Sequence, residues 1–142
     1  MGFYYGSAKA INFELEVKPF LEQKCLACHN PNVAKGKVDF SSAESIFGSK
    51  KELVIPGDAY ASEIWLASTS DDPNEPPYMP DEGEHLTKKE ADLLARWIDE
   101  GAKWPEGLVL REASKADKSW WAYQPLTNSG HSKIDSFIDK KL

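Results

Sequence analysis

Long apolar stretches are missing from this sequence of 142 residues, and no run approaches the ~20 apolar residues that a membrane-spanning helix needs. Basic charge is also in deficit, because 17 Lys and Arg face 23 Asp and Glu, for a formal net charge of −6. A nucleic-acid partner is therefore not expected, since such binding depends on an excess of positive charge. Length and composition instead indicate one small globular domain with an appendage.

Strands are equally hard to find, because residues 12–104 show no convincing alternation of apolar and polar side chains. The sequence therefore predicts an all-α fold. Apolar residues at helical spacing predict a first helix within residues 12–25, which Pro19 either opens or kinks. The clearest helix is expected over residues 88–100, with Thr87 and Glu90 as a capping box and Gly101 as its stop. Short helices are expected at 41–47, capped by a box at 41–44, and at 62–68, with a turn at 54–58.

Cysteine is scarce, and both cysteines of the chain fall in the run Cys25-Leu26-Ala27-Cys28-His29. C-x-x-C-H is the motif for covalent attachment of haem c. Two thiols three positions apart can each form a thioether with one vinyl group of the porphyrin. The histidine that follows then binds the iron as its proximal ligand. We therefore expect one covalent haem c held by Cys25 and Cys28, with His29 on the iron.

Other uses of two cysteines stay open on the residues alone: a redox-active dithiol, half of a zinc site, or a plain disulfide. A thioredoxin-like dithiol would follow a strand in a β-α-β pattern, and none is visible. A zinc site needs two ligands beyond the cysteines, and the chain offers only His29, His85 and His131. Haem c is the favoured interpretation.

Methionine is scarce too, and Met79 is the only one apart from Met1. It stands in the run Pro76-Pro77-Tyr78-Met79-Pro80, just before the last predicted helix. A thioether framed by prolines suits a soft ligand held against haem iron, so we expect Met79 as the distal ligand. His85 is the alternative ligand, and it would lower the reduction potential. The plain alternative is that Met79 packs as an ordinary loop hydrophobe.

The segment around Met79 is acidic. Its carboxylates are Asp71, Asp72, Glu75, Asp81, Glu82 and Glu84. A solvated loop is the plain interpretation. A sharper hypothesis places these carboxylates around an exposed haem edge, where they would favour ferric iron, lower the potential and select a basic redox partner.

The order of a first helix, C-x-x-C-H, short helices, a methionine loop and a last amphipathic helix resembles a class I cytochrome c. The first and last helices cross in that family, which implies a contact among Phe13, Phe20, Leu94, Trp97 and Ile98. A closer resemblance, over about residues 13–105, is to the planctomycete-type cytochrome c domain. It rests on residues 17–21, 25–29, 54–58, 62–64 and 95–105, and on Met79-Pro80. Its most distinctive part is the pattern I-P-G-D-x-x-x-S-x-I at 55–64. Family members often have Met-Pro-Pro where this chain has Met79-Pro80-Asp81.

The resemblance implies an N-terminal extension at 1–11, a cytochrome c domain at 12–106, and a C-terminal extension or linker at 107–142 with a short terminal helix. Such domains are usually modules at the start of large exported proteins. Because haem c is attached outside the cytoplasm in bacteria, we expect a periplasmic or otherwise exported protein. Residues 1–10 lack the basic start and apolar core of a signal peptide. We therefore interpret the chain as a mature form or an excised module, whose first residues need not be native. An aromatic cluster in the extension, at Trp120, Trp121 and Tyr123, either packs on the cytochrome or meets a following domain.

These patterns together predict outer-sphere electron transfer by one haem, and no enzymatic activity of this domain alone. Trp65, Trp97 and Trp104 are expected to pack on the haem, and Arg96 or Trp104 to meet a propionate. The alternative function is a haem enzyme or gas sensor with an open or displaceable sixth site. A third hypothesis is a structural domain whose haem mainly stabilises the fold.

Overall fold

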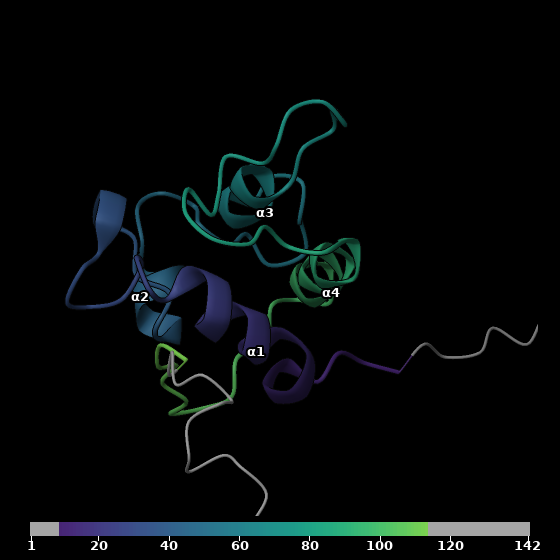
Figure 1. Ribbon diagram of the computed structural model, residues 1–142. Helices are drawn as coiled ribbons and strands as arrows, with labels where there is room; N and C mark the ends of the chain where they lie inside the picture. The colour runs from purple at the N-terminus through teal and green to yellow at the C-terminus, as the bar shows by residue number, and fades with distance from the viewer. Residues whose placement is uncertain (1–8, 114–142) are drawn as a thin grey trace, which may run out of the picture.

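The computed structural model of the protein describes residues 9–113, whose helices surround one small core (Figure 1). The α-helices are α1 (Lys18–Phe20), α2 (Ala43–Phe47), α3 (Glu63–Ser68) and α4 (Lys88–Asp99). Two π-helical turns, η1 (Phe13–Val17) and η2 (Leu21–Cys25), flank α1, and a 3-10 turn, η3, covers Lys35–Lys37. Within residues 9–113, β-strand pairing is limited to one isolated bridge between Ser42 and Val109. The regular structure of this part of the chain is therefore helical, as predicted. No helix in the described range combines the length and the apolar character needed to cross a membrane.

The N-terminal helical segment runs without a break from residue 13 to residue 25. Asn12 starts it, because its side chain accepts the N–H of Leu15 at 3.1 Å. Pro19 stands inside the segment, has no N–H to donate and crowds the preceding turn. The helix is wider there, and the N–H of Lys18 reaches back five residues to the carbonyl of Phe13. Of the two effects predicted for Pro19, the structure shows the disturbance of a running helix.

The N-terminal segment packs against α4 through aromatic side chains. The ring of Phe13 lies 5.2 Å from that of Trp97 and 4.5 Å from that of Trp104, measured between centroids. The residues expected at the helix crossing are all buried in one cluster: Phe13, Phe20, Leu94, Trp97 and Ile98. The predicted crossing is therefore confirmed, and burial of these side chains is its main stabilising contribution.

The ends of α4 are also those expected from the sequence. The hydroxyl of Thr87 accepts the N–H of Glu90, and the carboxylate of Glu90 accepts the N–H of Thr87 at 2.8 Å, which completes the capping box. After the helix, Gly101 has a φ of +105°, a conformation that a residue with a side chain adopts only under strain.

The turn at 55–58 docks on the C-terminal end of α4. The N–H of Gly57 donates to the carbonyl of Ile98 at 2.7 Å, and the N–H of Ala59 donates to the carboxylate of Asp99 at 3.0 Å. Gly57 makes this approach with a φ of +90°. The glycine of the pattern at 55–64 thus serves to place a tight turn against the last helix.

The serine of the same pattern holds the turn together from inside. Ser62 is fully buried, and its hydroxyl accepts the N–H of Ile55 at 2.9 Å and donates to the carbonyl of Asp58 at 2.7 Å. Both backbone groups would otherwise be poorly solvated. Ser62 is also the N-cap residue of α3, but its hydroxyl serves the turn and makes no capping bond to the helix.

Residues 107–113 pack on the helical core. Leu110 is buried, and its N–H donates to the carbonyl of Ser41 at 2.7 Å. The neighbouring Ser42 caps α2 by accepting the N–H of Ser45, so the cap lies one residue later than the predicted box. Packed structure therefore continues beyond the expected boundary at 106. The predicted terminal helix and the tryptophan pair lie outside the described residues.

We expect the Ser62→Ala substitution to lower the free energy of unfolding of the protein by about 1–3 kcal/mol, because it leaves two partly buried backbone groups without a partner. Urea unfolding followed by circular dichroism measures the change. The matched control is Ser70→Ala, since the Ser70 hydroxyl makes its bond in an exposed loop. Equal, small losses in both variants would contradict a role for the Ser62 hydroxyl.

Candidate haem-binding site

The C-x-x-C-H run forms a tight turn at the end of η2. Cys25 is the last residue of η2, and its carbonyl accepts the N–H of Cys28 at 3.3 Å and that of His29 at 3.1 Å. Leu26, between the cysteines, is fully buried and anchors the turn in the core. Both cysteines are half-buried and free. The turn thus presents two thiols and one imidazole from five consecutive residues.

The environment of Cys25 favours a neutral sulfur. Burial raises the pKa of its thiol to about 12, and the positive charge of Lys24 offsets only part of this effect. Redox-active dithiols and zinc ligands act as thiolates and need the opposite shift. A thioether carries no charge, so the surroundings of Cys25 suit attachment to a porphyrin better than either alternative. Within residues 9–113, no three His, Cys, Asp or Glu side chains lie close enough together to hold a metal ion.

The imidazole of His29 is oriented by the loop that follows it. Its Nδ1 lies 3.0 Å from the carbonyl oxygen of Lys35, which can only accept, so Nδ1 carries the proton. The Nε2 atom is then left with its lone pair, the form in which histidine binds a metal. Burial lowers the pKa of His29, which further favours the neutral ring. Phe40 contacts the ring edge-on, with centroids 5.3 Å apart.

The loop itself is closed by Asn30. Its amide donates to the carbonyl of Leu26 at 2.7 Å, and its side-chain oxygen accepts the N–H groups of Asn32 and Val33. The chain thereby reverses and brings the carbonyl of Lys35 back under the imidazole.

Met79 is half-buried, and its backbone lies against α3. Its N–H donates to the carbonyl of Ala67 in α3 at 2.7 Å. His85, the alternative ligand, is also half-buried, with its Nδ1 3.4 Å from the carbonyl oxygen of Met79. The segment that carries both residues is tied to the C-x-x-C-H region by two lysines. Lys35 pairs with Asp81 at 3.0 Å, and Lys24 donates to the carbonyl of His85 at 3.0 Å.

The three tryptophans predicted to pack on haem have different surroundings. Trp97 and Trp104 belong to the aromatic cluster with Phe13, and their indole N–H groups donate to the carbonyls of Lys103 and Leu108, both at 2.9 Å. The indole N–H of Trp65 is buried and has no partner among the described residues. The ring of Trp65 packs on the core and stacks edge-on against Tyr60 at 4.6 Å.

A buried N–H without an acceptor is costly, so the Trp65 indole indicates that an acceptor belongs beside it. A haem propionate is such an acceptor. Three features therefore make the residues present fit a covalent haem: the unpartnered N–H of Trp65, the neutral sulfur of Cys25 and the oriented imidazole of His29. Arg96, considered for a propionate, donates instead to Glu100 and to the carbonyl of Lys9. The sequence predicts that Trp65 packs on the haem but not that it meets a propionate, because which indole lacks a partner depends on the tertiary structure.

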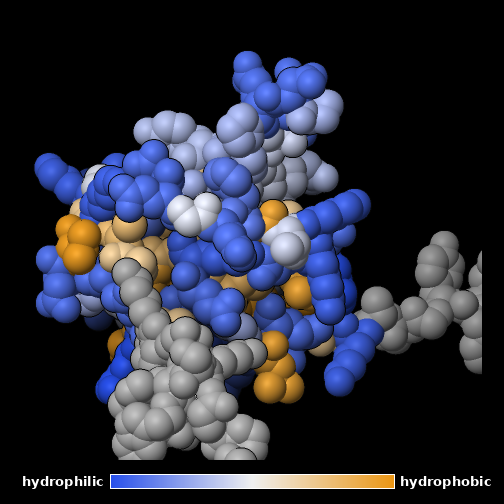
Figure 2. All heavy atoms as spheres, viewed as in Figure 1, coloured by the Kyte–Doolittle hydropathy of each residue, from blue (hydrophilic) through white to orange (hydrophobic). Residues whose placement is uncertain are grey.

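The acidic segment 71–84 is mostly exposed, and hydrophilic side chains cover the part of the surface beyond α3 (Figure 2). Asp72 organises its own loop by accepting the N–H and the side-chain amide of Asn74. Asp81 is paired with Lys35. The remaining carboxylates of the segment are exposed to solvent.

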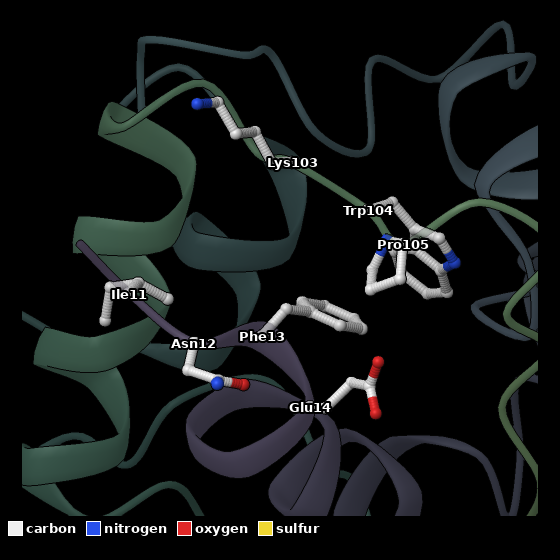
Figure 3. Close-up of a pocket in the computed structure, with 7 residues that line it drawn as sticks. All are labelled: Ile11, Asn12, Phe13, Glu14, Lys103, Trp104 and Pro105. Carbon is white, nitrogen blue, oxygen red and sulfur yellow. The ribbon is translucent and has the colours of Figure 1, made fainter.

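A shallow hollow of about 330 Å³ lies elsewhere, between the start of the N-terminal helix and the residues after α4 (Figure 3). Phe13 and Trp104, whose ring centroids are 4.5 Å apart, both line it together with the rest of residues 11–14 and 103–105. No predicted iron ligand lines this hollow, although Trp104, one of the tryptophans predicted to pack on the haem, does.

Residues 25–83 match the family model described as Planctomycete cytochrome C. The matched segment begins at the first cysteine of C-x-x-C-H and includes Trp65 and Met79, but it leaves out the N-terminal helix and α4. No curated protein and no solved structure matches the chain. The family match agrees with the geometry of the turn, and it supports a similarity of residues 25–83 to the planctomycete-type cytochrome c domain.

Proposed function

We propose that the described domain is a mono-haem c-type cytochrome module that carries out outer-sphere electron transfer. The observation that carries the proposal is the C-x-x-C-H turn, in which the carbonyl of Lys35 orients His29 and leaves Nε2 free. This turn lies inside the segment that matches a cytochrome c family. When bound, haem supplies a ferric/ferrous couple that takes up and releases one electron. The protein's part is to hold the ligands, limit access of water and set the potential.

Each residue of the site has a distinct task in this proposal. Cys25 and Cys28 form the thioethers, and His29 is the proximal ligand, whose basicity is raised by the Lys35 carbonyl. Met79 is the distal ligand, on a backbone anchored to α3. Its thioether suits low-spin iron that exchanges electrons without binding a substrate. A class I-like fold around one covalent haem follows from these roles.

Trp65 completes the site by donating its indole N–H to a haem propionate. This would satisfy a buried donor that the protein itself leaves without a partner. The bond also draws negative charge away from the iron, and a less negative surrounding favours the ferrous state. Trp65 would thus raise the reduction potential.

The setting of the module follows from haem c chemistry. Attachment of haem c outside the cytoplasm in bacteria supports a periplasmic or otherwise exported location, and the resemblance to modules of large exported proteins supports the same location. We infer that the domain passes electrons to or from an attached domain or a separate redox protein. The acidic segment 71–84 would favour a basic partner, because exposed charges of one sign steer the opposite sign.

Substituting Met79 by Ala tests the distal ligand. The intact ferric protein should be low-spin with the weak far-red absorption band of methionine ligation, and the ferrous protein should not respond to carbon monoxide. Met79→Ala should abolish the band and allow carbon monoxide to bind, because the sixth position opens. His85→Ala is the matched control and should retain the band. A low-spin ferric protein that lacks the band, and whose ferrous form binds carbon monoxide only after His85→Ala, would assign the sixth position to His85. Carbon monoxide binding by the intact protein would favour an enzyme or sensor.

Replacing Trp65 by Phe removes the donor and keeps an aromatic ring. We expect a lower reduction potential, because the propionate charge is then less neutralised near ferric iron. The free energy of unfolding of the haem-loaded protein should also fall by about 1.5–3 kcal/mol, the usual cost of losing a hydrogen bond to a charged group. Trp104→Phe loses a backbone bond instead and should leave the potential unchanged. A shift of equal size in both variants would argue against a Trp65–propionate bond.

Neutralising Asp71, Glu75 and Glu82 together tests the acidic segment. Oxidation of the ferrous protein by a cationic cobalt(III) complex should slow by roughly 3- to 10-fold at low ionic strength, and the difference should vanish at high salt. Neutralising Glu14, Glu44 and Glu106, which are exposed elsewhere, changes net charge equally and should have a smaller effect. Equal effects would mean that only net charge matters.

A further inference from the structure

Lys24 is buried to an unusual degree for a lysine, with 10% of its side chain exposed. It directly precedes Cys25 in the sequence. Its ammonium donates to the carboxylate of Glu90 at 2.7 Å and to the backbone carbonyl of His85 at 3.0 Å. One side chain thus links the haem attachment turn to two points near the start of α4.

Glu90 is held firmly enough to serve as a fixed partner. Its carboxylate also accepts the N–H and the hydroxyl of Thr87, at 2.8 and 3.0 Å. Burial by itself raises the pKa of Glu90, but the hydrogen bonds from Lys24 and Thr87 outweigh it and hold the pKa below its usual value. The carboxylate is therefore ionised at neutral pH, and Lys24 meets a full negative charge that α4 keeps in place.

The chain between Met79 and Thr87 has few other attachments in the described structure. Its start is fixed by the bond from the Met79 N–H to α3, and Asp81 reaches Lys35 in an exposed pair. Residues 82–84 are exposed and include Gly83, which has a φ of +98°. The carbonyl of His85 is the next point held, and Lys24 holds it. Leu86 then packs against the core.

We propose that Lys24 is a positioning residue for the distal ligand. By fastening the carbonyl of His85 and the carboxylate of Glu90 to the attachment turn, it closes the Met79 segment over the haem and keeps the methionine sulfur on the iron. This inference rests on the proposed function, because it takes Met79 as the ligand. In this role Lys24 acts only through the segment that it holds.

The second lysine provides a natural comparison. Lys35 reaches the same segment through Asp81, but its side chain is 49% exposed and that of Asp81 is 65% exposed. Exposed ion pairs of this kind contribute little, because water and salt screen them and two long side chains lose freedom. Lys35→Met leaves the backbone carbonyl that orients His29 in place. It therefore changes the charge as Lys24→Met does and removes only the weaker of the two attachments.

Imidazole added to the ferric haem-loaded protein is the probe, because it binds the iron only when the methionine has left. The apparent affinity of imidazole is its intrinsic affinity multiplied by the fraction of time that Met79 is off the iron. A looser Met79 segment therefore shows as tighter imidazole binding. We expect Lys24→Met to raise this affinity by roughly 10- to 100-fold, which corresponds to about 1.4–2.8 kcal/mol. Lys35→Met should change it by less than about 3-fold. The far-red band should weaken in the Lys24 variant and persist in the Lys35 variant.

Glu90→Gln is the second variant, in case Lys24→Met does not fold. Glutamine can still complete the capping box, so this change removes mainly the charge that Lys24 meets, and we expect a rise in imidazole affinity of roughly 3- to 10-fold. Unfolding in urea is measured for every variant. A Lys24 variant that unfolds more easily but binds imidazole like the intact protein would show a purely structural lysine and overturn the inference.

Two further results are decisive. Equal imidazole affinities for Lys24→Met and Lys35→Met would overturn the inference while leaving Met79 as the ligand. An intact protein that lacks the far-red band would instead overturn methionine ligation, and the positioning role would fall with it. The spectrum of the intact protein thus separates failure of the inference from failure of the proposed function.

Discussion

The hydrogen bond between the His29 imidazole and the carbonyl of Lys35 is the constraint around which the candidate site is arranged. It selects the protonated ring nitrogen and, with it, the nitrogen free for iron. The bond requires the chain to leave η2, turn at Asn30 and return within a few residues. The buried side chain of Leu26 holds the turn against the core, so the ligand geometry depends on core packing as well as on the loop.

The last helix organises both ends of the molecule, although it lies outside the segment that matches the family. Its N-terminal turn carries the carboxylate that meets Lys24, and its C-terminal end accepts the turn at 55–58 through Ile98 and Asp99. Its buried face meets the aromatic residues of the N-terminal helix. Apart from the N-terminal helical segment, the other helices have only a few residues and would not persist alone in water. They are therefore held by caps, by the docked turn and by contact with this helix, and a covalent haem would add further buried apolar surface to a small core.

Local chemistry in the sequence was enough to predict the elements with strong end signals. Thr87, Glu90 and Gly101 mark α4 because capping depends on residues a few positions apart. The C-x-x-C-H spacing predicts its own chemistry for the same reason. The widened turns beside Pro19 were only half predicted, because a proline can begin a helix or disturb one and the choice depends on what the helix packs against.

The remaining features of the site depend on contacts that sequence distance conceals. Ser62 belongs to the distinctive pattern and Trp65 is expected on the haem, whereas Lys24 looks ordinary in the chain. The hydrogen bonds of Ser62 and Lys24 and the missing partner of Trp65 appear only in three dimensions. For Lys24 the two partners lie more than sixty residues away, at His85 and Glu90. A lysine before a cysteine pair is expected to be a solvated charge, and burial alone turns it into a strong attachment, since a desolvated ammonium must be paired. The same reasoning separates it from Lys35, which reaches the same segment but remains in water. Burial, which the sequence does not report, therefore decides which of the two lysines can influence the haem.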